Sequence, residues 1–421
     1  MMIADAVLAC SLSGWCRDAL RIAQRAYALA GASEAVPPNV LGYLGGATTL
    51  RGGARQAWTF AEMLDEANAT VDPVSVEGQM LALSQVWRIW IGDFEREIVR
   101  LDALIGRARA AGAVGFLGYP LAWACELDFR LGRWQRARAE GEEALALLTE
   151  TGQESLVSFA MSSLATVEAG LGLSTAARAR AEDALEQGRA AGVGSAELYS
   201  AAVLAFVAMG EGQPEGAARA LEPLLGAVEG FGLAEPGTVL WQPDLIEAYA
   251  RLGMSAEARR ELAVLAEQAQ RTGGSWARAV TCRCRGLIDD DLDRHFGEAL
   301  ALHALTPTPF ERARTELAYG SRLRRAGRRT EARPQLERAL STFEDVGAEP
   351  WARQAREEIG ASGARLRRRR GGRPDEADAA VGVWPPEDGP WPNGALWFRV
   401  VSAHLVATPA VEIRAPPSSY G

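Results

Sequence analysis

The sequence predicts an all-α protein, a right-handed superhelix of antiparallel helix pairs (an α-solenoid) followed by a disordered tail. Three observations predict this fold: a helix-favouring composition, glycines that recur about every 40 residues, and apolar residues at helical spacing. Ala, Leu, Arg, Glu and Gly dominate the 421 residues, and aromatic residues make up only 7%. This mixture favours helix because Ala and straight-chain residues lose little side-chain freedom there.

Glycines divide the chain into repeats. We expect one set to close the first helix of each pair, because glycine adopts the left-handed backbone most easily. Its members recur at intervals of 40 or 41 residues: Gly52, Gly92, Gly132, Gly172, Gly212 and Gly253. A second set, expected to close the second helix, lies 20 residues further on: Gly112, Gly152, Gly192, Gly232 and Gly273. The pattern returns at Gly327 and Gly347, and a looser first copy runs from Gly14 to Gly31. The chain therefore holds about eight helix pairs.

Each first glycine is expected to precede a short turn and a second helix of about 17 residues. The two or three turn residues should include residues that often start helices: Ser174, Pro214, Ser255 and Thr330. Five positions after most of these glycines stands an Ala, which lets the two helices approach closely. The second helices carry apolar stripes, for example Trp134, Ala137, Ala144, Leu145 and Leu148. A single pair cannot bury such a stripe, so neighbouring pairs must stack.

The repeat after Gly253 lacks its glycine. We expect Arg294 and Ala299 to take the places of the glycine and the alanine. An acidic run that ends at Asp293 invites comparison with a calcium loop, but Arg294 stands where that loop needs Gly and Leu300 where it needs Glu. We therefore expect a solvated loop in which Asp293 caps the next helix.

The unit 131–137, Leu-Gly-Arg-Trp-Gln-Arg-Ala, resembles the interhelical turn of the tetratricopeptide family. The resemblance implies tetratricopeptide-like pairs over residues 1–362, with repeats of about 40 residues instead of the usual 34. Beyond them we expect an Arg-rich linker over 363–373 and a disordered Pro-, Gly- and Trp-rich tail over 374–421. The linker carries a cationic run that can contact nucleic-acid phosphates, although a solvated linker is the favoured interpretation: Arg367, Arg368, Arg369 and Arg370.

The residues needed for catalysis or metal binding do not gather in the sequence. All 45 cationic residues are Arg, which excludes a lysine-dependent phosphate loop and Schiff-base chemistry. Cys282 and Cys284 lie near His295 and His303, but the two thiols are expected on different helix faces, and zinc needs four converging ligands. We therefore expect no enzyme, no metal and no cofactor. A net charge of −9 and short apolar runs predict a cytoplasmic protein without a membrane span.

A partner-binding groove is the favoured kind of site. Solenoids present the first helix of each pair along a concave surface. Trp87, Trp123, Glu126 and Arg130 are expected on such helices, and aromatic and Arg residues are common anchors for a partner. For each named residue, however, the favoured interpretation is that the tryptophans fill gaps between repeats and Glu126–Arg130 is a surface pair.

Several stretches between residues 236 and 362 are similar to the helical-repeat region of large ATP-binding LuxR-type (maltose-activator-like) transcriptional regulators of high-GC actinobacteria. The clearest are 241–253, Trp-Gln-Pro-Asp-Leu-Ile-Glu-Ala-Tyr-Ala-Arg-Leu-Gly, and 347–352, Gly-Ala-Glu-Pro-Trp-Ala. The resemblance implies a sensor that acts through protein contacts or self-association. This chain lacks the Walker A loop, and after Arg370 it lacks the start of the helix-turn-helix, so ATP binding and specific DNA binding are not implied. A reading-frame shift, truncation or divergence would each produce such a tail.

Two hypotheses for the function follow. The first is a non-enzymatic regulatory scaffold, the sensor and protein-interaction part of a LuxR-type regulator. The alternative is a free-standing tetratricopeptide adaptor that binds a partner peptide in its concave groove.

Overall fold

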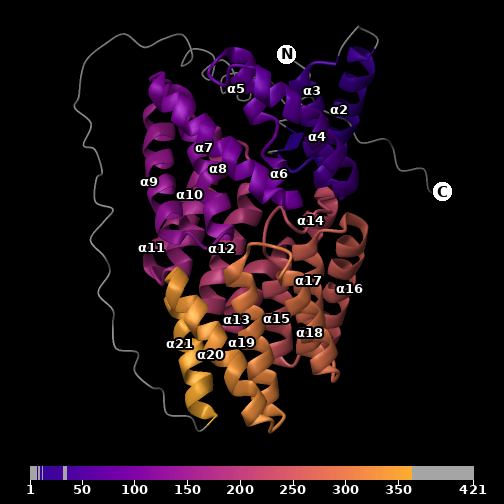
Figure 1. Cartoon of the computed structure of the whole chain (residues 1–421), viewed down its shortest axis with the longest axis vertical. Coiled ribbons are helices and arrows are strands. Elements are labelled where there is room, and N and C mark those ends of the chain that lie inside the picture. The colour runs from indigo at the N-terminus through magenta and orange to yellow at the C-terminus, as the bar shows by residue number, and fades with distance from the viewer. Residues whose placement is uncertain (1–6, 8–9, 12, 32–35, 363–421) are drawn as a thin grey trace, which may run out of the picture.

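The computed structural model describes residues 7–362 apart from 8–9, 12 and 32–35, and every regular element in this part of the chain is a helix (Figure 1). The predicted all-α fold of consecutive helix pairs is confirmed. The predicted linker, including Arg367–Arg370, and the predicted tail lie outside the described residues. None of the described helices is both long and apolar enough to cross a lipid bilayer.

The first half of the described chain forms helices α2 to α11. Their bounds are α2 Cys16–Ala30, α3 Pro38–Leu50, α4 Ala54–Thr70, α5 Val76–Leu83, α6 Trp87–Ile91, α7 Phe94–Ala110, α8 Val114–Arg130, α9 Trp134–Glu150, α10 Glu154–Gly170 and α11 Ser174–Ala190. The second half forms α12 to α21 and one short 3₁₀ helix. Their bounds are α12 Ala196–Gly210, α13 Pro214–Leu221, η1 Glu222–Leu224, α14 Leu225–Phe231, α15 Gln242–Leu252, α16 Ser255–Thr272, α17 Ser275–Ile288, α18 Leu292–His303, α19 Pro309–Arg325, α20 Arg329–Val346 and α21 Glu349–Ala361.

The repeat glycines end helices as predicted. Every glycine with a positive φ in the described part of the chain belongs to the predicted sets, with φ between 61° and 85°. Gly31 is the exception among the predicted stops, since its φ is −67°. The left-handed conformation turns the chain sharply, so only one residue separates Gly172 from α11. The expected turns of two or three residues are therefore too long. Ser174 and Ser255 are the first residues of their helices, and neither helix has a side-chain cap.

The glycine-free repeat turns earlier than predicted. Helix α17 ends at Ile288 and α18 begins at Leu292, so the turn occupies the three aspartates between them. Arg294 therefore lies inside α18, and the prediction that it replaces the turn glycine is wrong. The prediction that Asp293 caps the helix is also wrong, because Asp293 lies in the first turn of α18 and contacts Arg328 instead. Ala299 is fully buried in the helix.

Close packing at the fifth position after the glycine holds each pair together. Ala57, Ala137, Ala177 and Ala217 are all 0% exposed. In one repeat the position is Glu97, which is also 0% exposed and forms an ion pair with Arg100. The stripe of α9 is buried at Trp134, Ala137, Ala144 and Leu148, while Leu145 is half-buried. A small side chain at this position therefore sets the spacing between the helices of most pairs.

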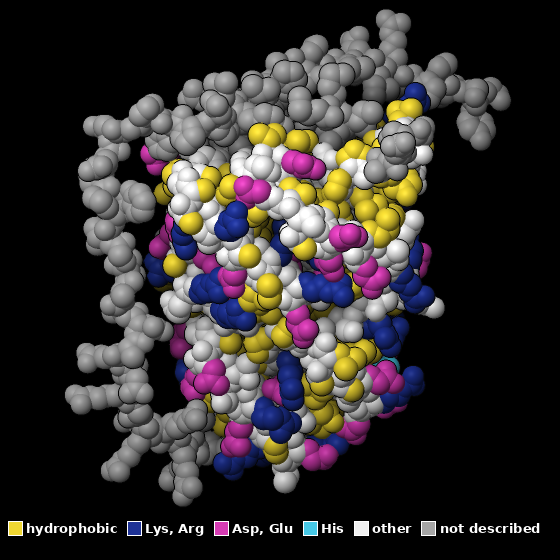
Figure 2. Space-filling view, turned by 45° about the horizontal axis from the view of Figure 1, so that its top comes forward, with side chains coloured by type: hydrophobic (Ala, Val, Ile, Leu, Met, Phe, Trp, Pro, Cys, Tyr) yellow, Lys and Arg dark blue, Asp and Glu magenta, His cyan; other side chains and the backbone are white. Residues whose placement is uncertain are grey.

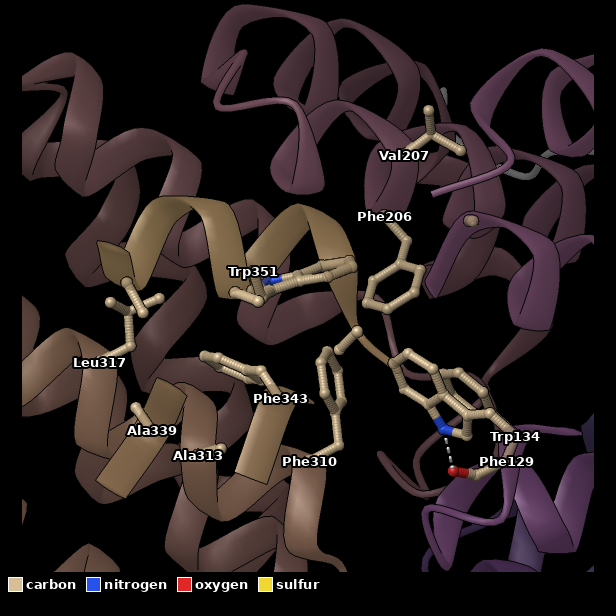
Figure 3. Close-up of a cluster of buried hydrophobic side chains, with 14 of the residues drawn as sticks. Phe129, Trp134, Phe206, Val207, Phe310, Ala313, Leu317, Ala339, Phe343 and Trp351 are labelled. Atoms are coloured by element: carbon tan, nitrogen blue, oxygen red, sulfur yellow. Dashed lines mark hydrogen bonds between the residues drawn. The ribbon is translucent and has the colours of Figure 1, made fainter. Parts of the chain in front are cut away.

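The superhelix curls until repeats far apart in sequence meet along two lines of contact (Figure 1). We call the first the aromatic seam, where α8–α12 meet α19–α21. Its rings pack together as drawn in Figure 3: Phe129, Trp134, Phe206, Phe310, Phe343 and Trp351. We call the second the arginine seam, where the region of α2–α4 meets α14, α16 and the segment 232–241. Its backbone contact is a hydrogen bond of 2.8 Å from the N–H of Ala234 to the carbonyl of Leu50.

Candidate partner-binding channel

The first helices of five consecutive pairs surround an apolar cavity of about 140 Å³, which we call the inner cavity. Helices α3, α6, α8, α10 and α12 contribute because the stacked pairs turn their first helices toward the superhelix axis. Aromatic side chains form much of the wall: Tyr43, Trp87, Trp90, Tyr119, Trp123, Phe159 and Tyr199. We call the concave space along the superhelix axis, which the first helices line, the channel. Leu156 and Phe159 in the cavity wall are half-buried, so the cavity opens onto this channel.

Trp123 lies at the centre of this wall. Its ring centroid is 4.2 Å from that of Phe159, 5.9 Å from that of Trp90 and 6.4 Å from that of Tyr119. Phe159 in turn contacts Tyr199 with a centroid separation of 5.6 Å. These tilted and edge-on contacts are favourable arrangements for aromatic rings. The chain of rings ties four neighbouring helix pairs into one rigid surface.

A few polar atoms interrupt the apolar wall. The hydroxyls of Ser158 and Thr238 and the indole N–H of Trp90 are buried and have no hydrogen-bond partner among the described residues. The Tyr119 hydroxyl donates a hydrogen bond of 3.0 Å to the carbonyl of Leu83, and burial raises its pKa well above the ordinary value. The wall therefore offers uncharged hydrogen-bonding groups beside a large apolar surface, the usual makeup of a ligand site.

A second, larger cavity of about 380 Å³ adjoins the first, and we call it the outer pocket. Trp90 lines both cavities and so lies in the wall between them. The outer pocket is more polar, since Arg55, Arg130 and Glu235 line it together with Trp276. Burial raises the pKa of Glu235 to about 7, against the opposing effects of the Gly237 N–H, Arg130 and Arg271.

An irregular segment of this chain, residues 232–241, lies in the channel between the two cavities. Its Leu233, Thr238 and Val239 line the inner cavity, and its Glu235 lines the outer pocket. Arg130 donates a hydrogen bond of 2.8 Å to the carbonyl of Gly237. The sequence analysis did not single out this segment. Its Pro-Gly step at 236–237, in the middle of a repeat, is the signal that marks a break in helix there.

The four residues predicted for the groove lie in different environments in the structure. Trp87 is 1% exposed, and its indole N–H is shared between the carbonyls of Gly42 and Ser84, each at 2.8 Å. It therefore fills a gap between repeats as well as lining the inner cavity. Trp123 lies in the cavity wall. Arg130 is 7% exposed and pairs with Glu126, so this pair is not on the surface, and Arg130 lines the outer pocket.

The Cys and His residues near α17 lie in different environments. Cys282 and Cys284 are buried, and burial raises the pKa of Cys284 to about 12. His303 Nε2 lies 3.0 Å from the Thr315 hydroxyl, and burial lowers its pKa to about 4. His295 faces Asp289 at 3.6 Å. Among the described residues, no three His, Cys, Asp or Glu side chains are arranged to hold a metal ion.

Comparisons with known proteins add one similar fold. No protein-family model matches the chain, and no curated protein matches it in sequence. Among solved structures, the crystal structure of a Rap protein complexed with competence and sporulation factor is 12% identical, with a TM-score of 0.48. The match covers 86% of this chain and 97% of that chain. At this identity and score, the similarity does not bear on the ligand or activity of this protein.

Proposed function

We propose that this protein is a non-enzymatic adaptor that binds an extended segment of a partner protein in its concave channel. The observation that carries the proposal is the segment 232–241, an irregular stretch of the chain held against the first helices of several pairs. Its backbone is bound by a side chain and by a main-chain group of the channel wall, Arg130 and the Leu50 carbonyl. These two groups hold a non-helical backbone of the chain itself, and we expect the rest of the channel wall to hold a partner's backbone in a similar way.

The inner cavity supplies the anchor. Its volume of about 140 Å³ is close to that of a dry engineered cavity of about 150 Å³ that binds benzene. The wall therefore accepts one ring or one branched aliphatic side chain of a partner. The buried hydroxyl of Ser158 and indole N–H of Trp90 in this wall have no hydrogen-bond partner among the described residues. Buried aromatic anchors of this kind dominate the binding energy of many interfaces.

Selection of binding peptides, followed by calorimetry with a channel variant, tests the proposal. A displayed peptide library should yield sequences that share one aromatic or branched apolar residue. Leu156→Trp fills the rim of the inner cavity and should weaken their binding by about tenfold or more, because the anchor is excluded. Leu145→Trp is the matched control, since Leu145 is also half-buried but lies on α9 outside the cavity.

Two results would contradict the proposal. One is a library that yields no binder with a shared apolar residue. The other is a set of binders whose affinity Leu156→Trp and Leu145→Trp change equally.

The finer hypothesis, that this scaffold is the sensor part of a LuxR-type regulator, is supported by the sequence resemblance over residues 236–362. It stays a prediction. The coding sequence on either side tests it: a Walker A stretch upstream and an out-of-frame helix-turn-helix downstream favour the regulator. Intact unrelated genes on both sides favour the adaptor.

A further inference from the structure

Four arginines gather at the arginine seam, around three of the repeat glycines. The Arg17 and Arg51 side chains both lie against Gly232, and Arg51 donates a hydrogen bond to its carbonyl. The Arg271 guanidinium lies over Gly52, where an added Cβ would be 2.7 Å from its Nε. Arg55 reaches back over Gly273, where an added Cβ would be 3.3 Å from its Nε. Arg271 of α16 thus lies against the glycine just before α4, and Arg55 of α4 lies against the glycine that ends α16.

No carboxylate of the described residues lies within 4.0 Å of a nitrogen of these four arginines. Elsewhere in the described chain, many arginines pair with carboxylates, although others, such as Arg25 and Arg219, do not. Arg136 contacts Asp102, Asp128 and Glu140, for example, although its own side chain is 42% exposed. On the face drawn in Figure 2, basic and acidic side chains are interspersed in the same way. The seam differs because arginines without carboxylate partners lie near one another there, in a chain whose net charge is −9.

Neighbouring groups supply little of the missing negative charge. Burial raises the pKa of the Cys16 thiol, beside Arg51, to about 11, so this thiol is neutral at pH 7. Glu235 is close enough for Arg271 to lower its pKa, but the two form no ion pair. Burial lowers the pKa of Arg51, and the nearby charges of Arg17 and Arg271 lower it further. The guanidinium groups of Arg17, Arg51 and Arg271 therefore repel one another, and no carboxylate of the described residues forms an ion pair with them.

We propose that the arginine cluster of Arg17, Arg51 and Arg271, with Arg55 on its outer-pocket side, is a binding site for a phosphate group. Arg17, Arg55 and Arg271 are exposed, so a ligand can reach them. A guanidinium presents several N–H donors in a planar fork that matches oxyanions. A carboxylate brings one negative charge and two oxygens, whereas a phosphate monoester brings about −1.5 to −2 at pH 7 and three acceptor oxygens. The phosphate is the better match for several unpaired guanidiniums.

The bound phosphate would join the two sides of the seam. Arg17 belongs to α2, Arg51 ends α3 and Arg55 lies in the first turn of α4, whereas Arg271 lies in the last turn of α16. Neutralising the cluster removes repulsion between these elements. The site adjoins the outer pocket through Arg55, but it does not depend on partner binding in the channel.

Thermal unfolding tests the site. Inorganic phosphate should raise the melting temperature above that in sodium chloride of equal ionic strength, because a ligand of the folded state stabilises it. Sodium acetate should have a smaller effect. A comparison of the melting temperatures in O-phosphoserine and in serine shows whether the site accepts a phosphate monoester as well as free phosphate. Equal melting temperatures in phosphate, chloride and acetate would overturn the proposal.

Variants assign the effect to the cluster. Arg17→Gln and Arg271→Gln should each weaken phosphate binding by about tenfold, since each removes a charge-assisted hydrogen bond. Arg17 makes no hydrogen bond to the described residues, so its variant is expected to fold. Arg21→Gln is the matched control on the same helix, because Arg21 is exposed and pairs with Asp18. An equal loss of the phosphate effect in Arg21→Gln and Arg17→Gln would show that the cluster is not the site.

Discussion

The two seams close the same superhelix with opposite chemistry. At the aromatic seam, rings from both sides meet in a continuous buried cluster, with Phe206 and Trp351 stacked at a centroid distance of 4.5 Å (Figure 3). Gln354 adds hydrogen bonds of 2.9 and 3.0 Å to the carbonyls of Met209 and Gly210. At the arginine seam, the polar contacts are one backbone hydrogen bond and hydrogen bonds from Arg51 and Arg271 to the carbonyls of Gly232 and Ala234, beside guanidinium groups that lie over glycines. Two cavities lie beside it.

This difference indicates that one seam fixes the closed solenoid and that the other responds to what binds there. Burial of large rings removes much apolar surface from water and so fixes the aromatic seam in one arrangement. The arginine seam holds like charges together, so we expect its stability to depend on what binds there. We infer that changes in conformation, where ligands cause them, start at the arginine seam.

The largest expected effect comes from Phe310→Ala in the aromatic seam. The Phe310 ring contacts Phe129, Trp134, Phe206, Phe343 and Trp351 and is 3% exposed. Its removal should lower the free energy of unfolding by about 3–5 kcal/mol, because a cavity replaces a fully buried ring. Urea denaturation followed by circular dichroism measures the loss. A loss no greater than that of Arg271→Ala would contradict the contrast between the seams.

Glycine substitutions should give intermediate effects that also differ between the seams. In Gly132→Ala the new Cβ would lie 2.7 Å from Cγ of Pro309, across the aromatic seam. In Gly212→Ala no atom lies within 4 Å, so only the left-handed backbone is strained, at about 1–2 kcal/mol. In Gly52→Ala the Cβ meets the flexible end of Arg271. We expect Gly132→Ala to lower the melting temperature most. Equal losses in all three variants would show that the neighbours across the seams do not matter.

The glycine period made the repeats predictable from the sequence, since a left-handed helix stop is a local property of the residue. The closure of the superhelix was not predictable in this way. It depends on small rotations between successive pairs, which accumulate until Phe310 meets Phe129. The same limit explains why the sequence predicted only part of the candidate site. Local spacing placed Trp123 on a first helix, but only the closed structure brings the segment 232–241 to Arg130.

An effect of similar size is expected from pH through Glu235. Its pKa is about 7 in the folded state against 4.5 as the ordinary value, so the folded state holds its proton more tightly than the unfolded state. The contribution of Glu235 to the free energy of unfolding is fully present below about pH 4.5 and is lost as the pH rises through 7. Glu235→Gln should therefore raise the free energy of unfolding at pH 8, by on the order of 2 kcal/mol, and change it little at pH 4. Urea titrations at both pH values measure the difference. A Gln variant that is less stable at pH 8 would contradict this expectation.

The smallest predicted effect is a difference in sign between two chemically identical substitutions on α2. Arg17→Gln removes a positive charge from the first turn of the helix, where the helix dipole disfavours it, and from beside Arg51. It should raise the free energy of unfolding by a few tenths of a kcal/mol at low salt. Arg21→Gln breaks the exposed pair with Asp18 and should lower it by about 0–1 kcal/mol. Added salt should shrink both changes. Calorimetry at two ionic strengths measures them, and a loss of stability in Arg17→Gln at low salt would show that the arginine seam is not under electrostatic repulsion.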